Sequence, residues 1–160
     1  MSQPGRQPAN TFFVRLDSET DFAGWRDAAR RLVLNQIEPH DIVWGMATDD
    51  DLFAAAAVLP DIPPSRTLNV QREFVERAEA VICHSEPSRF ALLYRILFRL
   101  TREPELLKIA SDPDIIRFYE LDKSVRRDIH KMRAFVRFVE IGEAEAVSYT
   151  HLTLPTILRV

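Results

Sequence analysis

The segment "SRFALLYRILFRLT" (residues 88–101) has the strongest apolar helical face in the chain, and it limits what the chain can fold into. Its apolar residues recur every three or four positions and so lie on one side of an α-helix: Phe90, Leu93, Tyr94, Leu97 and Leu100. Ser85 and Pro87 precede the helix as a cap and a first-turn proline, and Glu103-Pro104 ends it. Because this face has to be buried, the chain needs other elements that pack around it.

The sequence before this helix predicts two strands and two more helices. "TFFVRL" (residues 11–16) and "DIVWGM" (residues 41–46) are rich in strand-forming residues. Between them, Asp17, Ser18 or Thr20 can cap a helix that ends at Pro39, with an inward stripe of Phe22, Trp25, Ala29, Leu32 and Val33. A second helix is expected over about residues 70–83, with Phe74, Ala78 and Val81 facing inward.

The sequence after it predicts a long helix and a strand. A short helix is expected through Leu106 and Leu107; Asp112 and Pro113 then have the cap and first-position pattern of a helix that continues to about Met132. Residues 133–140 alternate with period two, as a strand does. We therefore expect an α+β fold, truncated, in which several amphipathic helices pack on a small, mainly antiparallel sheet.

Length and composition indicate one domain over residues 11–146, preceded by a disordered tail at residues 1–10. The chain has 160 residues, of which 46% are hydrophobic and 28% charged, which is ordinary for a globular protein. Cys83 is the only cysteine, so an intramolecular disulfide is excluded and an oxidising compartment is not implied. No apolar run reaches the roughly 18 residues that span a bilayer. We expect a cytoplasmic protein that does not use a membrane.

The helix over residues 113–132 gathers positive charge on one face, although the whole chain has a net charge of −3. At about 100° per residue, its inward positions fall within roughly 80°: Phe118, Leu121, Val125, Ile129 and Met132. The cations fall on the opposite arc, roughly 160° wide: Lys123, Arg126, Arg127, His130, Lys131 and Arg133. Lysine and arginine at helical spacing can contact successive phosphates, so these six residues are the candidate nucleic-acid-binding residues.

A solvated helix face is the competing interpretation of these cations. Glu120, Asp122 and Asp128 lie close enough in sequence to pair with them and to neutralise the face. Arg95, Arg99 and Arg102 also have helical spacing and can extend a basic surface, but the same pairing applies to them with more force.

No catalytic or metal-binding constellation is evident. Cys83 lacks a second cysteine for a zinc or iron–sulfur site and is expected to be a buried structural residue. The consecutive acids at residues 49–51 do not converge on one ion and lack the spacing of a calcium loop. His130 is the one candidate for acid–base chemistry, but its cationic neighbours disfavour the protonated form. We assign no catalytic residue, no metal and no cofactor.

Four segments resemble a bacterial DNA-metabolism family that is a domain of unknown function: "DFAGWRDAARRL", "VICHSEPSRFALLYRILFRL", "SDPDIIRF" and "DKSVRRDIHKMRAFVRF". The resemblance spans about residues 12–140, and its last segment is the most specific. It implies a domain found beside, or fused ahead of, iron–sulfur uracil-DNA glycosylases and beside a radical-SAM partner. This chain lacks the glycosylase motifs and the cluster cysteines, so no catalytic residue carries over.

The last 14 residues, "VSYTHLTLPTILRV", differ from everything before them. They have no charge before Arg159 and no helical period. Residues 147–156 resemble the translation of a transposon-type sequencing adapter, which implies that the natural protein continues differently after Ala146. We therefore base no functional prediction on residues 147–160.

The sequence thus predicts an accessory domain in DNA metabolism or repair that binds DNA through the basic helix face. Two alternatives stay open. One is an enzyme acting on modified DNA, with His130 facing a pocket completed by further C-terminal sequence. The other is a protein-interaction domain that docks on a uracil-DNA glycosylase or a radical-SAM protein through the same face.

Overall fold

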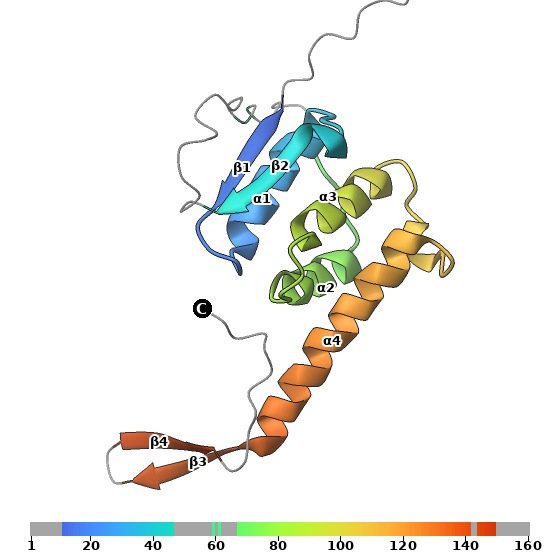
Figure 1. Ribbon diagram of the computed structural model, residues 1–160. Coiled ribbons are helices and arrows are strands. Elements are labelled where there is room, and N and C mark those ends of the chain that lie inside the picture. Colours follow the sequence, from blue (N-terminus) through green and yellow to red (C-terminus); the bar gives the residue numbers. More distant parts are fainter. Residues whose placement is uncertain (1–10, 47–58, 60, 62–66, 142–143, 150–160) are drawn as a thin grey trace, which may run out of the picture.

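The computed structural model describes residues 11–46, 59, 61, 67–141 and 144–149, with side chains described as far as Ala134 (Figure 1). The tail predicted at residues 1–10, the acids at residues 49–51 and residues 150–160 lie outside the described part. Helices and strands follow one another as β1 (Phe12–Leu16), α1 (Phe22–Leu34), β2 (Ile42–Met46), α2 (Arg72–Ile82), α3 (Arg89–Leu100), α4 (Pro113–Phe135), β3 (Val136–Ile141) and β4 (Ala144–Tyr149). Two short 3₁₀ turns accompany them, Pro39–Asp41 and Leu106–Lys108. The content of helices and strands confirms an α+β fold.

The sheet at the core is parallel, so the prediction of a mainly antiparallel sheet is wrong there. β1 and β2 pair in parallel, with Phe12 opposite Ile42 and Leu16 opposite Met46. The physical reason is the connection: α1 carries the chain back, and parallel strands need such a crossover. β3 and β4 form a separate antiparallel hairpin, which lies at the far end of α4 (Figure 1).

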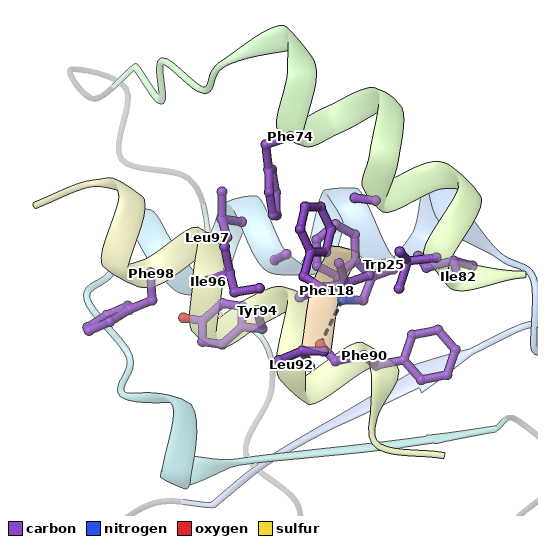
Figure 2. Packing of buried hydrophobic residues seen from close by; sticks show 14 of the residues in the cluster. Trp25, Phe74, Ile82, Phe90, Leu92, Tyr94, Ile96, Leu97, Phe98 and Phe118 are labelled. Atoms are coloured by element: carbon purple, nitrogen blue, oxygen red, sulfur yellow. Dashed lines mark hydrogen bonds between the residues drawn. The ribbon is translucent and has the colours of Figure 1, made fainter. Parts of the chain in front are cut away.

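α3 is the central helix of the core. It contacts α1, α2, α4 and β2, so it buries more than the one predicted face. Its buried residues are Arg89, Phe90, Leu92, Leu93, Tyr94, Ile96, Leu97 and Phe98. Figure 2 shows several of them, among them Leu92, Tyr94 and Ile96, in one cluster with Trp25, Phe74 and Phe118, which come from α1, α2 and α4.

Two hydrogen bonds fix aromatic side chains of this core. Trp25 Nε1 donates to the carbonyl of Phe90 at 3.3 Å, the contact drawn in Figure 2. The Tyr94 hydroxyl donates to the carbonyl of Ile37 at 2.7 Å. Buried polar groups need such partners, and each bond also joins segments that are far apart in the sequence.

Arg89 is the buried charge that joins three segments of the chain. Its guanidinium donates to the carbonyls of Ile82 (2.8 Å), Glu86 (2.9 Å) and Glu19 (2.7 Å). It also lies 4.2 Å from the ring centre of Phe90. Because the carbonyl of Ile82 ends α2, the cation stabilises a helix C-terminus and holds α2 against α3.

The start of α1 differs from the prediction. The N-cap is Asp21, whose carboxylate accepts the N–H of Gly24 at 2.8 Å, and not Asp17, Ser18 or Thr20. This close approach requires glycine, because a Cβ at position 24 would lie 2.1 Å from Asp21 Oδ2. The predicted inward stripe is confirmed at Trp25, Ala29, Leu32 and Val33, which are buried.

α4 begins as the sequence predicts. Asp112 Oδ1 accepts the N–H groups of Asp114 (3.0 Å) and Ile115 (3.2 Å), as an N-cap does. The first half of the helix packs on α2 and α3 through Ile115, Phe118, Leu121 and Val125, which are buried.

The second half of α4 extends away from α2 and α3 toward the hairpin (Figure 1). Ile129 is 42% exposed, so its predicted inward position is wrong. The apolar stripe continues along the helix, but the core that it packs against does not.

Candidate nucleic-acid interface

All six predicted cations lie on the exposed side of α4 between residues 123 and 133, and we call them the basic face: Lys123, Arg126, Arg127, His130, Lys131 and Arg133. The helix positions them, because its apolar side is turned to α2 and α3 over residues 115–125. The predicted geometry of one charged and one buried side is therefore confirmed as far as Val125. Whether the basic face binds nucleic acid is a separate matter of function.

Local ion pairs neutralise only part of the basic face. Arg126 Nε donates to Asp122 Oδ1 at 2.7 Å, and Arg127 Nε lies 3.9 Å from Asp128 Oδ1. In the described part of the chain, the other four residues have no ion pair: Lys123, His130, Lys131 and Arg133. The solvated-face interpretation therefore fits Arg126 best and the end of the helix least.

Arg77 of α2 lies beside the start of the basic face and pairs with two acids, and the sequence analysis missed it. Its Nη1 lies 2.5 Å from Asp122 Oδ2, and its Nε donates to Glu73 Oε1 at 3.1 Å. The carboxylate of Asp122 is only 3% exposed, so it is a fixed bridge between Arg77 and Arg126. Nothing in the local pattern of residues 70–83 shows that α2 packs beside α4, so the signal was not available before the fold was known.

A shallow depression of about 550 Å³ lies where these groups meet, and we call it the basic hollow. Its lining contains five potential cations and one acid: Arg77, Tyr119, Asp122, Lys123, Arg126, Arg127 and His130. Lysine and arginine in this arrangement can hold phosphate oxygens. Carbon atoms of these side chains supply most of the surface that lines the hollow, so only their charged ends could bind an anion.

Arg95 and Arg99 of α3 do not extend the basic face, because acids at the start of α4 hold them. Arg95 donates to both carboxylate oxygens of Asp114, at 2.9 and 2.7 Å. Arg99 donates to Asp112 at 2.7 Å and to Asp114 at 3.3 Å. The third member of this set, Arg102, lies 4.5 Å from the ring centre of Phe98. The pairing interpretation is therefore correct for Arg95 and Arg99, whereas Arg102 has no ion pair among the described residues.

The described residues offer little for catalysis or metal binding. No group of three or more His, Cys, Asp or Glu side chains among them comes together in a way that could hold a metal ion. His130 is exposed and has no hydrogen-bond or ion-pair partner in that part of the chain.

The other candidates for chemistry are structural. His84 Nδ1 accepts the N–H of Glu86 at 3.0 Å, and burial, followed by the charge of Arg117, lowers the pKa of His84. Cys83 is exposed, which corrects the prediction of a buried thiol: the residue lies just after α2, where the chain turns away from the core. Within the described ranges, no helix has the length and apolar content to cross a membrane.

Residues 87–155 match the model of a protein family, DUF4130, described as a domain of unknown function. The match begins just before α3 and takes in α4 and the hairpin. The resemblance to a domain of unknown function is thus confirmed for this part of the chain. The matched range also includes residues 147–155, of which 147–149 form the end of β4; the adapter origin of this stretch stays a prediction. No curated protein and no solved structure matches the chain.

Proposed function

We propose that this domain is an accessory module in DNA metabolism or repair that binds nucleic acid through the basic face of α4. The observation that carries the proposal is the set of exposed lysines and arginines of α4 without an acidic partner in the described chain: Lys123, Lys131 and Arg133. The resemblance noted in the sequence adds the DNA context. It also supports a uracil-DNA glycosylase domain or a radical-SAM protein as the partner that such a module serves.

The spacing of the cations suits a phosphate backbone. Lys123, Arg127 and Lys131 follow one another at four-residue intervals, which is about 6 Å along a helix axis. Duplex DNA carries one charge per about 1.7 Å of its axis, so several phosphates lie within reach of this face. Residues 120–134 contain five Lys or Arg and three Asp or Glu, whereas the whole chain has 21 and 24. The local excess of positive charge therefore favours an anion here over other surfaces.

Charge reversal at Arg127 and Lys131 tests the proposal. We expect the double variant R127E/K131E to bind a fluorescently labelled DNA more than tenfold more weakly at low salt. Its plot of log K against log salt should be flatter by about 2, because each lost phosphate contact removes about 0.9 from the slope. Fluorescence anisotropy across a salt series measures both quantities.

The matched control is R26E/R30E on α1, which has the same charge change and the same four-residue spacing on exposed positions. We expect this control to retain most of the affinity and the slope. Unchanged binding of R127E/K131E, or an equal loss in both double variants, would show that the basic face is not the interface.

Protein docking through the same face is a second candidate, favoured by the 42% exposure of Ile129 beside the cations. An apolar residue in a charged surface suits a protein partner better than a phosphate backbone. Pull-down of the glycosylase or radical-SAM partner that survives high salt and nuclease treatment, and that is lost on substituting Ile129, would favour docking over DNA binding. An enzyme completed by further sequence has no comparable support in the described residues.

A further inference from the structure

An apolar depression of about 320 Å³ lies directly beside the basic hollow, and we call it the apolar hollow. It is lined by Leu107, Ala110, Ile115, Ile116, Tyr119, Glu120 and Lys123. Tyr119 and Lys123 line both hollows, so the two are neighbours along α4. Ile116 is 44% exposed, which is high for a large apolar side chain, and it lies on the solvent side of the apolar hollow.

Tyr119 is fixed at the junction of the two hollows. Its hydroxyl donates to the carbonyl of Leu107 at 3.3 Å, and the guanidinium of Arg77 lies 4.9 Å from its ring centre. Burial, followed by the charge of Glu73, raises the pKa of Tyr119 above its ordinary value of 10.0. The one acid of the apolar hollow, Glu120, lies 3.3 Å from Arg117 Nη1, which offsets its charge. An apolar surface thus lies next to side chains that carry cationic groups.

We propose that the two hollows form one site for single-stranded nucleic acid, with an unpaired base against Ile116 and Tyr119 and its phosphates in the basic hollow. This inference rests on the proposed function and names the form of nucleic acid that the site takes. A nucleotide combines a flat apolar base with an anionic phosphate, and the site offers the complement of each side by side. In a duplex the base faces are stacked inside, so only an unpaired base can reach the apolar hollow.

The test compares three labelled oligonucleotides: a single strand, the duplex of the same sequence, and the single strand with abasic positions. Anisotropy titrations at one low salt concentration should show the intact single strand as the tightest ligand. The variant I116Q should weaken binding of the intact single strand severalfold, because it removes apolar contact between the side chain and the base. It should leave duplex binding, abasic-strand binding and the salt slope unchanged.

The matched control is I129Q, which changes an equally exposed isoleucine of the same helix outside the apolar hollow. We expect it to bind all three oligonucleotides like the unaltered protein. Equal binding of single strand and duplex with no effect of I116Q, or an equal loss in I116Q and I129Q, overturns the single-strand site. If R127E/K131E still weakens binding in that case, the proposed function stands without this inference; if no oligonucleotide binds, both fail.

Discussion

The arginines of α3 and the cations of α4 have the same spacing in the sequence but different surroundings in the structure. Arg95 and Arg99 face the start of α4, where Asp112 and Asp114 hold both of them. Lys131 and its neighbours project from the end of α4, where the described chain brings no acid to them. The comparison shows that a stripe of cations stays available to a ligand only where no other element supplies the opposite charge.

The start of the basic face, around Asp122, is intermediate between the paired arginines of α3 and the unpaired cations at the end of α4. Its buried carboxylate pairs with Arg77 and Arg126, but both arginines keep part of their surface exposed, 31% and 55%. They are therefore positioned by an acid and still accessible to a ligand. The same ion pairs that stabilise the packing of α2 on α4 also preorganise the basic hollow.

Removing the Asp122 carboxylate should have the largest effect on stability. The start of the basic face would then lack its acid and resemble the unpaired end of α4. We expect D122A to lower the free energy of unfolding by about 3 kcal/mol, because two charged hydrogen bonds to a buried carboxylate are lost. DNA affinity of the folded protein should rise, since the variant removes the negative charge from the basic hollow. Urea unfolding followed by tryptophan fluorescence, and anisotropy well below the unfolding midpoint, measure the two effects.

The control for D122A is D27A, which removes an exposed acid paired with Arg31 on α1. It should change stability by less than about 0.5 kcal/mol. A loss of stability in D122A no larger than that of the control would mean that the link between α2 and α4 is unimportant.

Neutralising one cation from each set should give the next largest effect on stability. R99Q should lower the free energy of unfolding by about 1.5 kcal/mol, because the pairs with Asp112 and Asp114 are lost. R127Q should change it by less than about 0.5 kcal/mol. DNA affinity should show the opposite order, with a loss in R127Q and none in R99Q. Equal effects of the two variants on both measurements would remove the distinction between paired and available cations.

The smallest effect concerns pH and the start of α4. The hydrogen bond from Arg99 is the main cause that lowers the pKa of Asp112 below its ordinary value of 3.8. The ionised carboxylate therefore adds stability above pH 3.8, and this contribution is lost as the pH falls through the lower pKa of the folded state. D112N keeps the cap but lacks the charge, so its deficit relative to the unaltered protein should be about 1 kcal/mol at pH 6 and should vanish toward pH 2. Urea unfolding midpoints at several pH values check this; a deficit that does not depend on pH would contradict the assigned role of the charge.

Several elements could be predicted because their signals are local. The cap at Asp112, the inward stripe of α1 and the exposure of Lys123 and Lys131 all follow from residues within a few positions of one another. The order strand, helix, strand over residues 11–46 also contained the signal for a parallel pair, since such strands need a crossover. The prediction of a mainly antiparallel sheet did not use it.

The sequence by itself thus determined most of the helices and strands and which side of α4 is charged, because spacing along the chain decides which residues share a helix face. It placed the start of β3 at residue 133, whereas α4 continues to Phe135, and it did not predict β4. Only the tertiary structure decided which cations are paired, that Arg77 joins the basic hollow, and that Ile129 lies beyond the core. The physical reason is that these properties depend on contacts between α2, α3 and α4. How these helices pack decides whether a side chain on one of them faces an acid, the core or solvent. A charge that is free in the sequence can be neutralised by a residue 45 positions away, as Arg77 and Asp122 show.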